Sequence, residues 1–151
     1  LKRIFSADRK AGYMLALAEN NVPFQENYYL EMPQVPKNKT DRLLRFLSRE
    51  DRPTAVLVSD DILAMVLEKT AFELHLQIPE DLSIISFNNS LFSKLSSPQL
   101  TSIDINSRQL GIEAASQMIN HIENPGLLAT KIIVPHFMIE RQSCAPPKAP
   151  R

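Results

Sequence analysis

The chain has 151 residues, 44% of them hydrophobic, and its 17 basic and 17 acidic side chains leave a formal net charge of zero. This length supplies one ordinary domain with a real core, and the zero charge is a poor match for a free-standing nucleic-acid-binding domain, which usually carries a basic surplus. The single Cys144 excludes an internal disulfide and a multi-cysteine zinc site, and no apolar run is long enough to span a membrane.

Two helices are predicted in the first third of the chain. Apolar residues at helical spacing indicate one over residues 7–20 and another from Thr40 or Asp41 to about residue 49. Between them lie a plausible strand at 27–30 and a proline-containing loop at 32–39.

Residues 53–89 predict a βαβ unit, which is two parallel strands joined by a helix. Residues 55–58 form a continuous apolar run, typical of a strand buried on both faces, and residues 82–87 form a second one. The helix between them has apolar residues three and four positions apart and ends before a proline. At the start of this helix we expect Asp61 to be the cap and Asp60 to face a cleft.

The last third continues the alternation of helices and strands. The expected elements are a loop with one helical turn at 90–100, a strand at 101–105, a helix capped by Asn106 or Ser107, strands at 131–134 and 137–141, and a disordered tail at 145–151. Alternation of this kind predicts an α/β protein with a doubly wound parallel sheet.

Polar side chains directly follow the predicted strands, at the edge where ligands bind in open parallel sheets. Asp60 follows one strand, Asn88 follows the next, Arg9 lies in the first turn of a helix, and Phe87 offers an aromatic face. Each has a plainer explanation alone, since aspartate and asparagine are common in caps and turns and an arginine there can be a solvated surface residue. Together they resemble a site for a polyol, whose hydroxyls need donors and acceptors beside an apolar surface.

Signatures of enzymes are scarce. Only three glycines occur, and none of the glycine-rich loops that cradle phosphates is present, so we expect no cofactor and no enzymatic activity. Asp60 and Asp61 are a weaker candidate for a Mg²⁺ site of the receiver or hydrolase type, since the next strand ends in asparagine and lacks a phospho-accepting aspartate. The chain has three histidines far apart, which favours surface positions over a metal site: His75, His121 and His136.

Five motifs in order resemble those of the lactose/galactose repressor family of bacterial transcription regulators, and within it those of maltose-operon repressors. They are DRKAGYMLAL, PTAVLVSDDILAM, IPEDLSIISFNN, SPQLTSIDINSRQLGIEAA and IIVPHFMIERQSC, and they span about residues 7–144. The chain departs from the family's GFDD wording, because Ser86 replaces the glycine and Asn88 and Asn89 replace the two aspartates. Asparagine both donates and accepts hydrogen bonds and carries no charge, so the departure bears on which sugar binds.

The resemblance implies the C-terminal part of an effector-binding region with the fold of type I periplasmic binding proteins. The implied parts are a C-terminal lobe at 1–103, a segment at 104–134 that belongs to the N-terminal lobe, and a return to the C-terminal lobe at 135–144. The N-terminal helix-turn-helix that would bind operator DNA is expected in a longer cytoplasmic protein, since this chain opens without a signal peptide or an initiator methionine.

The resemblance also implies residue roles. Effector contacts fall on Arg9, Asp60 and Asn88, with Phe87 nearby and Ser107 facing them from the other lobe. A homodimer surface falls on Met65, Lys69 and Phe92, although Met65 is equally well explained as a core residue. The expected function is control of operator affinity by a sugar effector. The alternatives are a periplasmic-type sugar receptor without a DNA role and the Mg²⁺-dependent domain of the receiver or hydrolase type.

Overall fold

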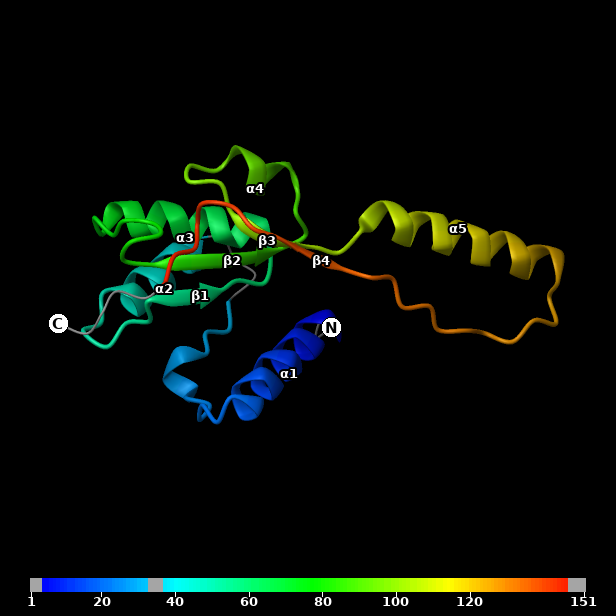
Figure 1. Ribbon diagram of the computed structural model, residues 1–151, viewed down its shortest axis with the longest axis horizontal. Coiled ribbons are helices and arrows are strands. Elements are labelled where there is room, and N and C mark those ends of the chain that lie inside the picture. The colour runs from blue at the N-terminus through cyan, green and yellow to red at the C-terminus, as the bar shows by residue number, and fades with distance from the viewer. Residues whose placement is uncertain (1–3, 33–36, 147–151) are drawn as a thin grey trace.

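The computed structural model describes residues 4–32 and 37–146 and shows an α/β body from which a long arm projects (Figure 1). The body contains α1 (Ile4–Glu19), the 3₁₀ helix η1 (Glu26–Tyr28), α2 (Lys37–Leu47), β1 (Ala55–Leu57), α3 (Asp61–Glu73), β2 (Ser83–Phe87), α4 (Leu91–Leu95), β3 (Thr101–Asp104) and β4 (Phe137–Ile139). The arm consists of α5 (Ser107–Glu123) and the extended segment that leads back to β4.

The body is built on one four-stranded sheet in the order β1-β2-β3-β4. β1, β2 and β3 are mutually parallel, with Val56 opposite Ile84 and Ser86 opposite Ser102. β4 runs antiparallel to β3, and Phe137 lies opposite Asp104. The predicted βαβ unit and the α/β class are thus confirmed, with an antiparallel strand added at one edge of the sheet.

The hydrophobic core joins the sheet to α2 and α3. Among the described residues, the buried apolar side chains come from both helices, from β2 and from positions that adjoin strands: Leu43, Phe46, Leu47, Val58, Leu63, Ala64, Leu67, Ala71, Leu82, Ile84 and Leu100. The alanines at 64 and 71 have no exposed surface, and their small side chains let α3 approach its neighbours closely. Burying each of the leucines stabilises the fold by roughly 1.5–3 kcal/mol relative to leaving it exposed.

A buried carboxylate at the start of α3 ties this helix to the sheet. Asp61 is 1% exposed, and its Oδ1 accepts hydrogen bonds from Ser86 Oγ at 2.5 Å and Ser102 Oγ at 2.9 Å. Its Oδ2 accepts from the backbone N–H of Ser90 at 2.7 Å. One side chain therefore links α3 to β2, to β3 and to the loop after β2.

The segment after β4 closes the opposite end of the sheet. Ser143 Oγ donates to the carbonyl of Ile84 at 2.6 Å and accepts from the N–H of Thr101 at 2.8 Å. The carbonyl of Ser143 accepts from the N–H of Ile84 at 2.8 Å. Ser143 thereby satisfies backbone groups of both β2 and β3 where the two strands begin.

Several elements differ from the sequence-based expectations. Residues 27–30 do not form a strand: η1 occupies part of this stretch, and aromatic contacts hold the segment to α1, with Phe24 ring centroids 6.5 Å from Tyr13 and 6.2 Å from Tyr29. The second helix, α2, begins and ends earlier than predicted. The expected loop at 32–39 falls partly on residues 33–36, which lie outside the described residues, as do 147–151 of the expected tail.

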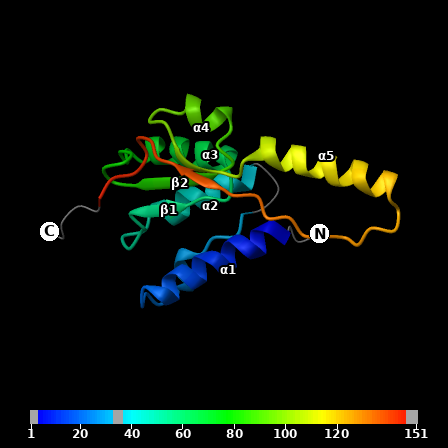
Figure 2. The same ribbon diagram turned by 45° about the vertical axis from the view of Figure 1, so that its right-hand side comes forward.

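Residues 131–134 are extended but pair with no strand among the described residues, because they lie in the arm, away from the sheet (Figures 1 and 2). For the same reason, the apolar side of α5 contains no buried residue. β1 was expected to be buried on both faces, yet Leu57 is 44% exposed. β1 is an edge strand, and α1 lies apart on the side of β1 away from α3 (Figures 1 and 2). No helix in the described ranges has the length and apolar character needed to cross a membrane.

Glu68 on α3 is shielded from solvent at Oε1, which has no hydrogen-bond partner of normal geometry among the described residues. Burial raises the pKa of its carboxyl, and the nearby Ser96 hydroxyl lowers it to a smaller extent. The charged form of Glu68 is therefore less favourable in the folded chain than in the unfolded chain.

Replacing Asp61 tests the buried carboxylate. We expect Asp61→Ala to lower the free energy of unfolding by about 2–4 kcal/mol, because two hydroxyls and one N–H lose their acceptor. Urea unfolding followed by circular dichroism measures the loss. The control is Asp41→Ala at an exposed position of α2, which should change the same quantity by less than about 0.5 kcal/mol. Equal effects of both variants would contradict the linking role of Asp61.

Replacing Glu68 tests the effect of its burial on stability. We expect Glu68→Gln to raise the free energy of unfolding at neutral pH, because the variant carries no charge to desolvate. A raised pKa gives the wild type a penalty that is absent at acidic pH and develops as pH rises through the folded pKa, so the gain should vanish in acid. Unfolding at several pH values checks this, with exposed Glu123→Gln as the control. A gain that does not depend on pH would rule out the charge as its cause.

Candidate functional site

The carboxyl ends of β1 and β2 lie side by side and bring several predicted site residues together. The backbone N–H of Val58, just after β1, donates to the carbonyl of Ile85 at 2.8 Å. Asp60 follows β1 by three residues, and Phe87 is the last residue of β2. Because parallel strands end at the same edge of a sheet, this edge collects polar side chains from distant parts of the sequence.

Arg9 reaches this edge from α1. Its Nη1 donates to the carbonyl of Ser59, and its guanidinium carbon lies 4.2 Å from the ring centroid of Phe87. Burial lowers the pKa of Arg9, while the charge of Asp60 acts in the opposite direction. An arginine remains charged at neutral pH despite such a shift, so the edge presents a cation held over an aromatic face.

The two adjacent aspartates have exchanged the roles expected from the sequence. Asp60, not Asp61, is the N-cap of α3, and its Oδ1 accepts from the N–H of Leu63 at 2.9 Å. Its Oδ2 accepts from Ser59 Oγ at 3.0 Å. Asp61 points into the body instead, because its carboxylate is used by hydroxyls on the strands. Asp60 still lies at the edge with Arg9, but it also stabilises the helix.

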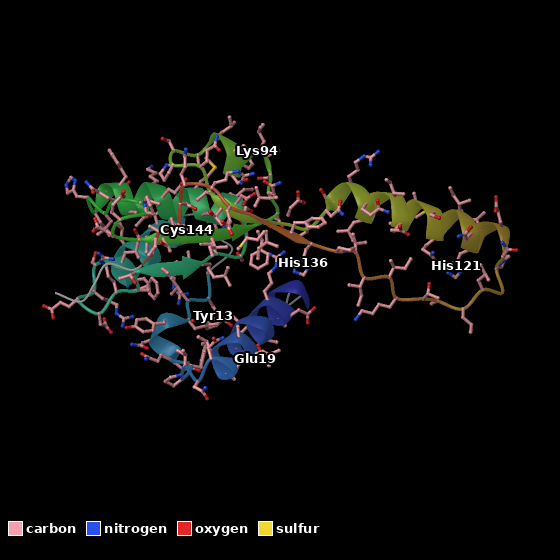
Figure 3. All side chains as sticks on the ribbon, in the orientation of Figure 1. Tyr13, Glu19, Lys94, His121, His136 and Cys144 are labelled. Carbon is pink, nitrogen blue, oxygen red and sulfur yellow. The ribbon has the colours of Figure 1, made fainter. Side chains whose placement is uncertain are left out.

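The pair therefore does not form a Mg²⁺ site of the receiver type, since both carboxylates are engaged in hydrogen bonds of the fold. No group of three or more potential metal ligands occurs within the described ranges. Figure 3 places His121 on α5 and His136 where the arm returns to the body, well apart from each other.

Asn88 and Asn89 turn the chain sharply after β2. Both have left-handed backbone conformations, with φ values of 100° and 45°, which asparagine adopts more readily than most residues. The backbone N–H of Asn88 donates to the carbonyl of Ile103 at 2.8 Å. Asn88 directly follows Phe87, the residue whose ring Arg9 contacts. The hydrogen bond to Ile103 holds the backbone of Asn88 against β3.

Ser107 is not brought into this group. It is exposed as the first residue of α5, after Asn106, whose φ of 51° is also left-handed. Two open surface hollows lie elsewhere: one of about 400 Å³ beside Glu68 and Phe72, and one of about 460 Å³ beside Met14 and Phe24. Neither is lined by Arg9, Asp60 or Asn88.

The three residues implied as a dimer surface are all exposed. Met65 and Lys69 lie on α3 and Phe92 lies on α4, and the two helices are in contact. Lys69 forms an i,i+4 ion pair with Glu73 at 4.0 Å. Other exposed apolar residues on these helices are Ile62, Phe72, Leu91 and Leu95. Met65 is 38% exposed, so it is not a core residue of this chain.

A polar cluster that was not predicted from the sequence lies beside the candidate site. Arg141, just after β4, donates from Nη2 to Asn89 Oδ1 at 2.5 Å and from Nη1 to the carbonyl of Leu100 at 2.6 Å. Asn89 in turn donates from Nδ2 to Asp104 Oδ2 at 2.9 Å. Arg141 occurs in the last of the five motifs, which was the only signal available, and its partners are far away in the chain.

The geometry provides a cation, a carboxylate and an aromatic face along one sheet edge, and Asn88 directly follows the aromatic residue. Groups of these kinds suit the recognition of a small polar molecule with several hydrogen-bonding groups. The arrangement contains donors and acceptors for recognition, and Asp60 also caps α3 and accepts from the Ser59 hydroxyl.

The chain matches the family model described as a periplasmic binding protein-like domain over residues 3–144. It is 32% identical over 143 residues to the HTH-type transcriptional repressor PurR of Photorhabdus laumondii, covering 95% of this chain and 42% of the repressor. The solved structure of a putative transcriptional regulator LacI from Bacillus cereus subsp. cytotoxis has a TM-score of 0.86 at 31% identity, covering 93% of this chain and 50% of that one. The transcription regulator CcpA of Lactococcus lactis has a TM-score of 0.81 at 27% identity, covering 96% of this chain and 53% of that one.

These relatives are transcriptional repressors and regulators, in agreement with the resemblance to the lactose/galactose repressor family. The chain spans 42% of the length of the curated repressor it matches. Because the family match covers nearly all of it, this chain belongs to the family of periplasmic binding protein-like domains, and its relatives there are LacI-type regulators of transcription.

Proposed function

We propose that this chain is the effector-binding and dimerisation region of a transcriptional repressor. A small ligand at the sheet edge would alter the affinity of the whole protein for operator DNA, by favouring one arrangement of two lobes over another. The observation that carries the proposal is the convergence of Arg9, Asp60 and Phe87 beside Asn88. The repressor relatives support this role over that of a sugar receptor without a DNA function.

DNA binding would belong to a helix-turn-helix outside this chain, in a protein that acts in the cytoplasm. The zero net charge fits a region that does not contact DNA itself. The names of the curated relatives, which describe HTH-type repressors longer than this chain, support the same division.

The body would be the C-terminal lobe and the arm would pack into the N-terminal lobe. The boundaries proposed from the sequence, at about residues 104 and 134, fall close to the two points where the arm leaves and rejoins the body (Figure 1). The arm exposes apolar side chains on both of its segments: Leu110, Ile112, Met118, Ile119, Ile122, Leu127, Leu128, Ile132 and Ile133. Apolar surface of this extent in a soluble protein is normally covered, and an N-terminal lobe would cover it.

The proposed effector is a sugar, with a maltose-like disaccharide as the first candidate. Arg9 and Asn88 can donate to hydroxyl oxygens, Asp60 Oδ2 can accept from a hydroxyl, and Phe87 can face a sugar ring. The Arg9 guanidinium already lies over the ring of Phe87. A bound sugar would therefore either contact Phe87 beside the guanidinium or displace the guanidinium from the ring. The same groups suit a planar heterocycle with polar edges, so nucleobases are the natural comparison. Ser107 would contact the ligand from the other lobe only after lobe closure.

The homodimer would form through α3 and α4, with Met65, Lys69 and Phe92 in the interface. The exposed residues Ile62, Met65, Lys69 and Phe72 recur at intervals of three and four along α3, so they share one face of the helix. The apolar residues of α4 extend this face. A twofold axis here would apply each contact twice and would place two DNA-binding domains at two half-sites.

Effector recognition is tested in the full-length protein with a panel of disaccharides, monosaccharides and nucleobases. We expect one class of compound to change operator affinity in a gel-shift assay. We expect Arg9→Ala and Asp60→Asn each to weaken binding of that compound by about 1–3 kcal/mol in calorimetry, because each removes a charged hydrogen-bonding group. Asp60→Asn is preferred to Asp60→Ala because asparagine also caps helices well.

The control for this experiment is Arg45→Ala at an exposed position of α2. Arg45→Ala should keep the free energy of unfolding within about 0.5 kcal/mol of the wild type. Arg9→Ala and Asp60→Asn should lower it by no more than about 1.5 kcal/mol, the scale of one lost hydrogen bond. A panel with no effect on operator affinity would refute the effector role. Loss of folding in Arg9→Ala would show that this residue is structural.

The dimer surface is tested with Met65→Glu and Phe92→Glu in the full-length protein. We expect each substitution to raise the dissociation constant of the dimer at least about tenfold, because each of the two subunits would bury an unpaired carboxylate in the interface. Sedimentation equilibrium measures the dissociation constant. Leu15→Glu on α1, where the side chain is also exposed, should leave it unchanged. A dimer that tolerates both substitutions would have to use another surface.

A further inference from the structure

Three segments of the chain meet in one polar cluster at the base of the arm. The loop after β2 contributes Asn89, the end of β3 contributes Asp104, and the segment after β4 contributes Arg141. β3 is the strand that leads into the arm and β4 is the strand that returns from it (Figure 1). The cluster therefore connects the loop beside the candidate site to both ends of the arm.

The hydrogen bonds form a continuous path from the loop after β2 to the arm. The N–H of Asn89 donates to Ser102 Oγ at 3.0 Å, and its Nδ2 donates to Asp104 Oδ2 at 2.9 Å. The other oxygen of Asp104 accepts from the N–H of Asn106 at 2.7 Å. Asn106 is the N-cap residue of α5, so Asp104 fixes the turn at which the arm begins.

Both functions of the Asn89 amide are used. Its oxygen accepts from Arg141 Nη2 at 2.5 Å, and its nitrogen donates to Asp104. Hydrogen bonds from Asn89 and from the N–H of Asn106 lower the pKa of Asp104, with smaller contributions from the charges of Lys94 and Arg141. Asp104 is therefore a carboxylate at neutral pH, and the pair at 89 and 104 contains one carboxylate and one amide.

An aspartate at 89 could still accept from Arg141, but its second oxygen would face a carboxylate oxygen of Asp104 with no proton between them. If position 104 then became asparagine, its amide would donate to the new carboxylate and its oxygen would still accept from Asn106. The two positions are therefore complementary, and the same hydrogen bonds form when the amide and the carboxylate are exchanged.

We propose that Asn89 and Asp104 are a pair of positioning residues that accepts one carboxylate and one amide, and that this pair, held by Arg141, couples the ligand-binding edge to the orientation of the arm. The ligand role of that edge rests on the proposed function, whereas the coupling itself concerns contacts within this chain. A ligand that moves Asn88 would also move Asn89, its neighbour in the chain. The hydrogen bonds of Asp104 to Asn89 and Asn106 would then pass this displacement to the first turn of α5.

The experiment is amide hydrogen exchange on the full-length protein without any ligand. The variants are Asn89→Asp and the double variant Asn89→Asp with Asp104→Asn. The matched control is Asn27→Asp, because Asn27 Nδ2 donates to Asp51 Oδ2 at 3.4 Å and Arg49 binds the same carboxylate. This second asparagine, aspartate and arginine set lies away from the arm and receives the same added charge.

We expect Asn89→Asp to accelerate exchange at Asn106 and in the first turn of α5 by about tenfold, because the turn loses a firmly placed acceptor. The double variant should return to within about threefold of the wild type, and Asn27→Asp should leave this region unchanged. Exchange in the centre of α3 should stay within about twofold in all variants, which separates local coupling from a general loss of stability.

Unchanged exchange at Asn106 in Asn89→Asp, or a double variant no closer to the wild type than the single one, would overturn the proposal. If Asn89→Asp does not fold, a folded double variant with exchange near that of the wild type still supports the pair, and an unfolded double variant overturns it. Because no ligand is used, this outcome is independent of the effector panel: a coupled arm without any active compound would refute the proposed function and leave the pair intact.

Discussion

The buried carboxylate of Asp61 is the interaction on which the rest of the structure depends. It has almost no exposed surface and receives hydrogen bonds from both central strands and from the loop after β2. A buried charge is tolerated only when such partners replace water. The requirement fixes where α3 starts relative to β2 and β3, and it therefore fixes Asp60, the neighbouring residue, at the edge of the sheet.

The candidate site is a consequence of this arrangement. Parallel strands place Asp60 and Phe87 at one edge, and α1 brings Arg9 to the same place through Ser59 and the aromatic ring. The left-handed backbone conformations of Asn88 and Asn89 then turn the chain sharply, so the two successive residues make different contacts. Asn88 directly follows Phe87 and is bound to β3 through its backbone N–H, while the side chain of Asn89 joins Arg141 and Asp104.

The sequence predicted those features that local pattern determines. The βαβ unit was predictable because its apolar runs and helical spacing are contiguous, and the shared edge follows from parallel pairing. Capping preference alone does not say which of two adjacent aspartates is the cap, since the answer depends on Ser86 and Ser102 in distant strands. Residues 27–30 and 131–134 have strand-like composition, but a strand also requires a neighbour to pair with. Arg141 was missed because its contacts join segments remote in sequence.

The antiparallel pairing of β3 with β4 gives the arm a simple topological description. Asp104 lies opposite Phe137, so β3 and β4 are neighbouring antiparallel strands, and the arm with its helix α5 is the connection between them. The two ends of the arm are thus held side by side by the ladder between β3 and β4, although 32 residues separate them along the chain. Any shift in the register of these two strands would displace the start of the arm relative to its end.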